Sequence, residues 1–588
     1  MNRPGLNRLP PCLDNTTTSR APFVIIHGAH GFAIEFRAFL AISAFFHPHF
    51  SMGIAYQFAY IVVDCVFWAW FRHITVLGRQ NIPPSRRRPL LLACTHNNMV
   101  VDPFVLAWSM PHRREVHFWA KNTIFHPPLA AKILRHLGAV PVDRTTGNNA
   151  GLWKSTLECF DQGGVIAVFP EGTSYTLPHL LPLRDGASWA ALEHYKEYVL
   201  GHMKGPEVQI IPVGITYLQK EQWRSDVIVA YGPPIDFTLP GKRFTDISIQ
   251  LDKLKCDIHG NEERMEDLES QRRAIVKQVT ADIDQALRKL TVNAPDWPTM
   301  EAAKVARCML VPDDLIILDV YVKLLQSLIS VLTLDSEMIG DKHILSDESD
   351  REEIRNLRLE LDRYAGLLRE IKVTDGDIVA HSRHALTPVN ISFRLLLQSL
   401  QFVVEIPLFL PGILFHLPVY GLARLVEGME KYEECKAQNK IILSVFVLPL
   451  LYMLLCYSIY RYVFAGTVAG LVAAALLTIT FAVYHVTLVD DRYRRWESVR
   501  ATYRMWDAVV FAEKGDKEKL ERRRKVWEAV ELRQTCVIKL ERVLEKGRVA
   551  GREAEQYLSG YRDRVDQATM LDGHAHAVSG LAGTVHSL

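Results

Sequence analysis

Residues 89–104, PLLLACTHNNMVVDPF, predict a buried strand, a loop and the start of a helix. The run 89–95 is short, apolar and unbroken, which is typical of a strand covered on both faces of a sheet. Asp102 precedes Pro103, and this pair predicts a helix that begins here with the aspartate as its N-cap. His96 then falls in the loop at the carboxyl end of the strand, where α/β proteins carry functional groups.

The same pattern of short apolar runs separated by turns and amphipathic stretches extends to about residue 290. Four more strands are predicted: VHFWA (116–120), GVIAVF (164–169), VQIIPVGITY (208–217) and VIVAYG (227–232). Helical sequence lies between several of them, which favours a parallel or mixed sheet covered by helices. In the last long strand, Pro212 and Gly214 indicate an edge or a bulge beside a pocket.

Length, charge and cysteine usage limit the class of protein. A chain of 588 residues exceeds one compact core, so several segments are expected. The net charge of +2 gives no support for nucleic-acid binding. The nine cysteines show neither a CxxC pair nor a Cys/His cluster at zinc spacing. This favours a reducing compartment and predicts no structural metal. The first residues lack the pattern of a cleaved signal peptide, so no cleavage is expected.

Apolar segments on both sides of this region predict contact with a membrane. The N-terminal one fits two helices lying in or dipping into a bilayer, with a buried soluble helix pair as the alternative. Residues 441–460 and 465–489 predict a tight transmembrane hairpin, and the proline-containing stretch 391–419 favours a re-entrant or interfacial element. The predicted organisation is a disordered arm (1–22), N-terminal membrane-associated helices (23–74), the α/β domain (75–290), a helical accessory region (291–385), the membrane region (386–490) and a cytosolic helical tail (491–588).

Basic residues flank the predicted hairpin and give its orientation. Because positively charged residues near membrane spans stay in the cytosol, both ends of the hairpin and the α/β domain are expected on that side. Three arginines after the N-terminal apolar region agree with this. The residues are Lys431, Lys436 and Lys440 before the hairpin, Arg492, Arg494 and Arg495 after it, and Arg86, Arg87 and Arg88.

His96 and Asp102 predict a general base. An imidazole removes a hydroxyl proton near neutral pH, and a carboxylate on its other nitrogen fixes the tautomer and stabilises the imidazolium. The alternative is that Asp102 is only a helix cap. No GxSxG motif occurs in the chain, which argues against a serine mechanism of the α/β-hydrolase kind.

Two further stretches predict recognition of a phosphorylated acceptor. In GAVPVDR (138–144), Arg144 precedes a turn-rich loop suited to binding a phosphate with a guanidinium fork, although a solvated arginine is the alternative. In VFPEGTSY (168–175), glycine allows close approach of a ligand and the glutamate can accept hydrogen bonds from hydroxyl groups. Arg184, in LLPLRDG, is a second cation for the same phosphate, with an ordinary salt-bridged turn as the alternative.

In order and spacing, HNNMVVD, GAVPVDR, FPEGTS and IIPVGITY resemble the four motifs of the glycerolipid acyltransferase family, over about residues 75–240. FPEG followed by LLPLRDG, together with a C-terminal membrane hairpin, resembles the fungal-type glycerol-3-phosphate and dihydroxyacetone-phosphate acyltransferases. One feature departs from the family's usual first motif, which has four residues between its His and Asp: here there are five.

The resemblance implies transfer of a fatty acyl group from acyl-CoA to the sn-1 hydroxyl of glycerol-3-phosphate, dihydroxyacetone phosphate or both, the first step of glycerolipid synthesis. It implies acyl-CoA as co-substrate with no cofactor or metal, and an endoplasmic reticulum membrane as the location. Two alternatives stay open, a lysophospholipid acyltransferase and a catalytically inactive lipid-binding scaffold. The residues that it implies are the base pair His96 and Asp102 and the acceptor-binding set Arg144, Glu171, Gly172, Thr173 and Arg184.

Overall fold

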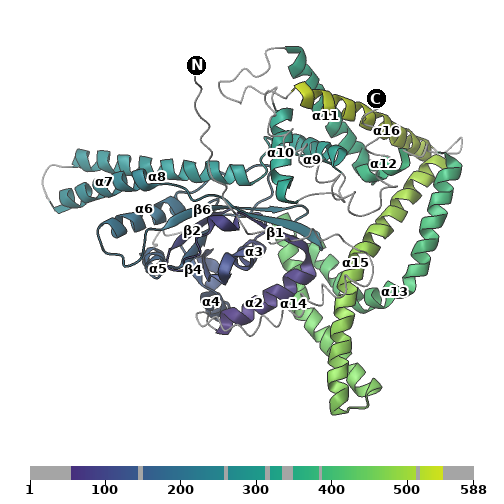
Figure 1. The fold of residues 1–588 in the computed structure, drawn as a ribbon, viewed down its shortest axis with the longest axis horizontal. Helices are drawn as coiled ribbons and strands as arrows, with labels where there is room; N and C mark the ends of the chain where they lie inside the picture. The colour runs from purple at the N-terminus through teal and green to yellow at the C-terminus, as the bar shows by residue number, and fades with distance from the viewer. Residues whose placement is uncertain are drawn as a thin grey trace, which may run out of the picture. The chain divides into compact units, whose positions relative to one another are not determined.

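A computed structural model describes residues 54–143, 150–256, 262–311, 318–333, 348–382, 387–510 and 517–546. The predicted arm, the first part of the N-terminal apolar region, the end of the tail and Arg144 lie outside these ranges. All seven strands form one sheet in the order β1-β7-β6-β2-β5-β3-β4, with every pair parallel except β6 and β7. The strands are β1 Phe71–Leu77, β2 Leu90–Cys94, β3 Val116–Lys121, β4 Ala139–Val142, β5 Val165–Val168, β6 Gln209–Tyr217 and β7 Ser225–Tyr231 (Figure 1).

The five predicted strands are confirmed, and the structure adds two at the edges of the sheet. β4 is the short run before Arg144. β1 begins at Phe71, inside the stretch predicted to be membrane-associated as far as residue 74, so that boundary is wrong. This segment forms a strand because of a tertiary contact. Ile74–Leu77 pair residue by residue with β7, more than 150 positions later in the chain.

The prediction of an edge or a bulge at Pro212 and Gly214 is also wrong, because β6 lies inside the sheet between β2 and β7. Pro212 is tolerated there because antiparallel pairing with β7 starts only at Val213, so no ladder bond needs its missing N–H. Gly214 is required by packing: a Cβ atom at this position would lie 2.6 Å from the carbonyl oxygen of Leu290.

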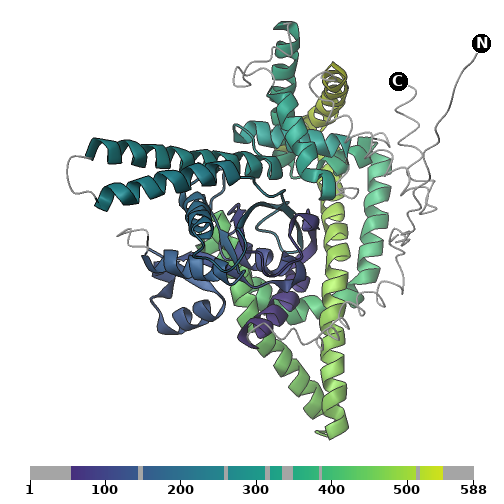
Figure 2. The same ribbon diagram turned by 60° about the vertical axis from the view of Figure 1, so that its left-hand side comes forward.

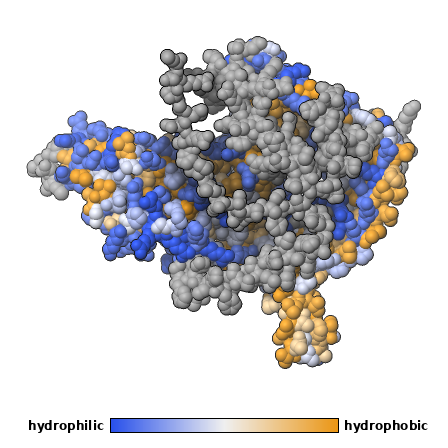
Figure 3. Space-filling view, in the orientation of Figure 1, coloured by the Kyte–Doolittle hydropathy of each residue, from blue (hydrophilic) through white to orange (hydrophobic). Residues whose placement is uncertain are grey.

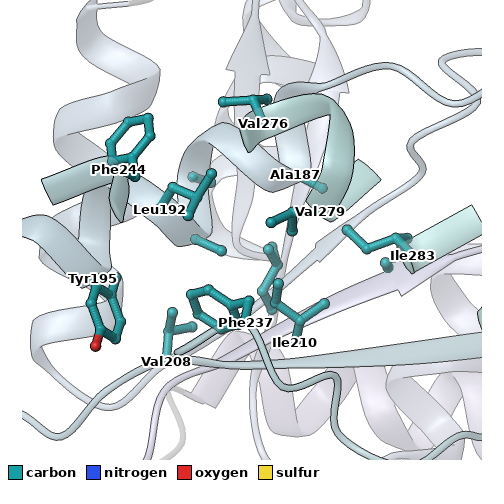
Figure 4. Close-up of a cluster of buried hydrophobic side chains, with 14 of the residues drawn as sticks. Ala187, Leu192, Tyr195, Val208, Ile210, Phe237, Phe244, Val276, Val279 and Ile283 are labelled. Atoms are coloured by element: carbon teal, nitrogen blue, oxygen red, sulfur yellow. The ribbon is translucent and has the colours of Figure 1, made fainter. Parts of the chain in front are cut away.

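Helices cover both faces of the sheet. One face carries α6 (Gly186–Val199), α7 (Thr238–Cys256) and α8 (Glu262–Leu290), whose apolar side chains pack on β6 and its neighbours (Figure 4). The other face carries α2 (Ile54–Trp70) and α3 (Val101–Ser109). Phe67 and Trp70 of α2 are buried in that second core. The described part of the predicted membrane-associated segment therefore also covers the α/β domain.

The accessory helices and the C-terminal helix pack together. Asp375 accepts hydrogen bonds from Tyr364 Oη at 2.8 Å and from Arg533 Nε at 2.7 Å, and Lys539 Nζ lies 2.5 Å from Glu360 Oε1. These contacts join helices that are far apart in the sequence. The helices are α9 Trp297–Leu310, α10 Leu318–Leu332, α11 Glu348–Ile371, α12 Asp375–Ser382 and α16 Lys517–Lys546 (Figure 2).

Within the described ranges, three helices are long and apolar enough to cross a membrane. They are α13 (Pro388–Met429), α14 (Glu433–Ser458, extended to Val463 by a π-helical turn) and α15 (Val468–Val510). α14 and α15 form the predicted hairpin, whose tip is a largely hydrophobic projection (Figure 3). The stretch predicted to be a re-entrant or interfacial element is one continuous helix, α13. Its three internal prolines are accommodated because the helix packs along α15 over much of its length.

Candidate active site

His96 and Asp102 are brought together at the carboxyl end of β2. The Nδ1 atom of His96 lies 2.9 Å from Oδ2 of Asp102, and the aspartate is completely buried. The imidazole ring stacks on Phe169, with 4.2 Å between ring centroids. Because the carboxylate engages Nδ1, Nε2 is the nitrogen that faces a substrate.

Asp102 does not cap the helix, so the predicted N-cap is wrong. The N-cap position is Val100, and Asp102 lies inside the first turn of α3. Its Oδ2 turns back and accepts hydrogen bonds from the backbone N–H groups of Asn97 and Asn98, each at 2.7 Å. Together with His96 and Tyr217 Oη, which donates to Oδ1 at 2.7 Å, these donors hold the buried carboxylate. The aspartate therefore orders the loop that carries the histidine.

The five residues between His96 and Asp102 still allow this contact. The loop accommodates them with a left-handed residue, Met99, whose φ is 38°. The side-chain amide of Asn97 donates to the carbonyl oxygen of Ile215 at 3.0 Å and that of Asn98 to Lys220 at 3.3 Å, so both asparagines fasten the loop to β6 and the turn after it.

Glu171 lies directly under the histidine loop. Its Oε1 accepts the backbone N–H of His96 at 2.9 Å, whereas its buried Oε2 has no hydrogen-bond partner in the described part of the chain. Burial is the main cause that raises the pKa of this carboxyl group to about 8, despite the opposing hydrogen bond from His96. At neutral pH the group is therefore mainly protonated, and the free oxygen can donate a hydrogen bond as well as accept one.

Gly172 and Arg184 form the next part of the site. Gly172 has a φ of 77°, and a Cβ atom there would lie 2.5 Å from Nε of Arg184. The backbone N–H of Arg184 donates to Pro170 at 2.8 Å, which closes the loop that follows β5. The left-handed backbone favours glycine at this position, and the absence of a side chain leaves room for the guanidinium packed against it.

A cavity of about 760 Å³, here the first cavity, joins these groups. His96, Gly172, Thr173 and Arg184 line it, and most of the remaining wall is apolar. That wall comes from α2, α3, β3, β5 and the segment around α4 (Pro128–His136). One elongated space therefore combines a base, a cation and an apolar surface.

Sequence reasoning missed two side chains of this site. Lys121, the last residue of β3, lines the first cavity and adds a second cation. Tyr217, the last residue of β6, fixes Asp102. Each stands at the end of a strand, but only the order of strands in the sheet brings them near His96. Across the described ranges, no group of three or more His, Cys, Asp or Glu side chains is placed to hold a metal ion.

Comparison with known proteins finds a similarity to one protein family over part of the chain. Residues 73–216 match the family model described as acyltransferase. That span runs from β1 to β6 and includes the histidine loop, the glutamate loop and the residues that line the first cavity, except Tyr60 and Val63 of α2. It ends just before Tyr217.

Curated relatives point in the same direction at low identity. Glycerol-3-phosphate O-acyltransferases 2 and 1 of Saccharomyces cerevisiae are 22% and 23% identical to the chain over 52% and 49% of its length. The matches cover only 37% and 34% of those yeast proteins. The 1-acyl-sn-glycerol-3-phosphate acyltransferase of Bacillus subtilis is 25% identical over 19% of this chain and 54% of its own.

One solved structure is also similar, the 1-acyl-sn-glycerophosphate acyltransferase PlsC of Thermotoga maritima. It shares 18% identity, over 43% of this chain and 93% of its own, with a TM-score of 0.24.

Proposed function

We propose that residues 73–216 form an acyltransferase domain of the glycerolipid acyltransferase type. In this proposal the chain acylates glycerol-3-phosphate, dihydroxyacetone phosphate or both at the sn-1 hydroxyl, with acyl-CoA as donor. The observation that carries the proposal is the first cavity. His96, held by Asp102, faces a space whose wall combines the cations Arg184 and Lys121 with a mostly apolar surface.

The reaction needs a base and no enzyme nucleophile. Nε2 of His96 takes the proton of the acceptor hydroxyl while its oxygen attacks the thioester carbonyl, and Asp102 stabilises the resulting imidazolium. The carbon–sulfur bond then breaks and the thiolate of coenzyme A accepts a proton. Donor and acceptor are bound together, and no acyl-enzyme forms.

The acceptor is held by groups around the histidine. In this proposal Arg184 and Arg144 bind the phosphate, while Gly172 and Thr173 let it approach the backbone of the loop. Glu171 is not among the residues that line the first cavity, and in this proposal it supports the acceptor site by holding the backbone N–H of His96. Lys121, on the wall of the same cavity, adds to the positive charge there.

A direct assay tests the activity. Purified protein in detergent or vesicles should transfer radiolabelled acyl groups from palmitoyl-CoA to glycerol-3-phosphate or dihydroxyacetone phosphate. The alternative within the family, acylation of 1-acylglycerol-3-phosphate, is tested by competition in the same assay. If the lysolipid is the preferred acceptor, the proposed acceptor class is wrong. No transfer to any of the three would favour an inactive scaffold.

The two arginines should act on the acceptor. A charge-assisted hydrogen bond contributes about 1.5–3 kcal/mol, so Arg144→Ala should raise the KM for the phosphorylated acceptor roughly ten- to a hundredfold. Arg184→Ala should give a smaller effect of the same kind, since solvent screens the charge of this exposed side chain. The KM for acyl-CoA should hardly change. Arg243→Ala, an exposed arginine on α7 outside the cavity, is the control. A rise in the acyl-CoA KM alone would assign these arginines to the donor.

The packing of the helices limits how the chain crosses the bilayer. α12 and α16 touch through Asp375 and Arg533, so both lie on one side of the membrane. The three long apolar helices lie between them in the sequence, and an odd number of crossings would separate α12 from α16. We therefore propose that α14 and α15 cross as a hairpin while α13, which packs along α15, does not cross. Many apolar side chains of α13 are exposed, which allows this helix to contact the membrane interface.

Accessibility tags test this topology. Tags near residues 130 and 510 should both report the cytosol, and a tag at the hairpin tip near Gly466 should report the opposite side. The basic residues at both ends of the hairpin favour this orientation. Finding the tags near 130 and 510 on opposite sides would overturn the hairpin and show that α13 crosses too. The proposed location in the endoplasmic reticulum is checked separately, by fractionation.

A further inference from the structure

The first turns of α14 are docked on the acyltransferase domain. Lys436 Nζ lies 2.9 Å from Glu221 Oε2, and Lys440 Nζ donates to the carbonyl oxygen of Glu221 at 3.1 Å. Between them Ala437 is completely buried in the core that includes α3 and the sheet. The helix that begins the membrane hairpin therefore starts as a packed part of the domain.

α14 also touches the loop of the proposed catalytic base. Oε1 of Gln438 accepts the backbone N–H of Val100 at 3.3 Å, within the loop between His96 and Asp102. A residue of the membrane hairpin thus contacts the loop that positions the imidazole.

A second cavity, of about 720 Å³, lies between α2, α3, α4 and α14. Its wall is almost entirely aliphatic and aromatic. α14 contributes one side of it with Gln438, Ile441, Ile442, Val445 and Phe446. Ile442 and Phe446 are exposed and belong to the apolar stretch of α14 that continues to the hydrophobic tip (Figure 3). The second cavity therefore lies where the hairpin leaves the domain.

The two cavities adjoin each other. Four residues line both of them: Val63 on α2, Val100 and Phe104 at α3, and Leu137 after α4. The apolar linings of the two cavities thus meet at Phe104 and Leu137, which marks a path from His96 to the side of α14.

We propose that the acyl chain of the donor follows this path, so that α14 forms the far wall of the acyl-binding site and selects for chain length. The inference rests on the proposed function. The thioester carbonyl sits at His96, the proximal methylene groups fill the apolar part of the first cavity, and the distal ones pass Phe104 into the second. A flexible linear hydrocarbon fits such a path because its wall is apolar and offers the distal part of the chain few polar partners. Each methylene group buried there strengthens binding about fourfold.

Blocking the second cavity should shorten the preferred chain. Val445 lines this cavity, whereas Val447, two residues further along the same helix, lines neither. Val445→Trp should lower kcat/KM for palmitoyl-CoA at least tenfold, because only the longer chain reaches α14. The value of kcat/KM for octanoyl-CoA should stay within about twofold of that of the wild-type protein. Val447→Trp, the matched control, should keep the wild-type ratio between the two donors.

The ratio of kcat/KM for the two donors distinguishes a blocked path from a disturbed fold, since misfolding lowers kcat/KM for both donors alike. A Val445→Trp protein with the wild-type ratio would overturn the inference. Wild-type protein that transfers neither acyl group would overturn the proposed function itself, and this inference with it.

A second measurement uses the unmodified protein. A palmitoyl-CoA analogue with a photoreactive diazirine at the end of the chain should label peptides from residues 433–458. An octanoyl-CoA analogue of the same design should instead label segments around the first cavity. If the long probe labels only segments of the first cavity, the chain does not reach α14 and the inference fails.

Discussion

Replacing His96 with alanine should lower kcat by about a hundred- to ten-thousandfold, the range expected for loss of a general base. The KM values for both substrates should change little, because the imidazole accepts the proton of the acceptor hydroxyl and does not bind the acyl chain or the phosphate. The measurement is a steady-state assay of acyl transfer from palmitoyl-CoA with saturating acceptor.

The fold should survive this change. Glu171 holds the loop through the backbone N–H of His96, which alanine keeps, and Asp102 retains its bonds to Asn97, Asn98 and Tyr217. The loss of stability should be about 1.5–3 kcal/mol, the contribution of one hydrogen bond to a charged group. His96→Gln, which keeps a polar side chain near Asp102 but has no base, should be as slow as the alanine variant.

The control is His202→Ala, which removes an exposed imidazole paired with Glu197 away from the cavity. It should leave turnover unchanged. Near-normal turnover in a folded His96→Ala protein would falsify the proposed mechanism.

Replacing Asp102 with asparagine should have the second largest effect, a loss of about a hundredfold or more in kcat. The amide oxygen can take the place of Oδ2 and still accept from His96, Asn97 and Asn98. The amide nitrogen then faces Tyr217, whose hydroxyl can accept as well as donate. The loop is therefore kept, whereas the negative charge that stabilises the imidazolium is lost.

Two further variants serve as comparisons for Asp102→Asn. Tyr217→Phe keeps the carboxylate and removes one of its donors, so it should lose much less turnover than Asp102→Asn. Asp102→Ala leaves two buried N–H groups and the tyrosine without their acceptor, and it should lower the melting temperature clearly as well as the rate. If asparagine unfolds the protein as alanine does, or keeps full turnover in a folded protein, the proposed role of the charge is wrong.

Much of the α/β domain was predictable because its strands carry strong local signals. A run such as 89–95, apolar throughout and bounded by turn residues, is unlike any loop, and all five strands predicted in this way are present. The motifs stand at the ends of those strands, so the site residues could be nominated from the sequence. The hairpin also followed from local composition, since two long apolar runs with a short polar break have few alternatives in a membrane protein.

What the sequence could not determine depends on contacts between distant segments. β1 is a strand because β7 pairs with it, and α13 is one helix because α15 packs along it. Asp102 is a buried acceptor for the histidine loop instead of a helix cap, because the loop folds back over it. Tyr217 and Lys121 join the site only through the strand order, and α14 reaches the catalytic loop only through its docking on Glu221. Local sequence sets what each segment prefers to be, whereas burial between segments decides which residues meet.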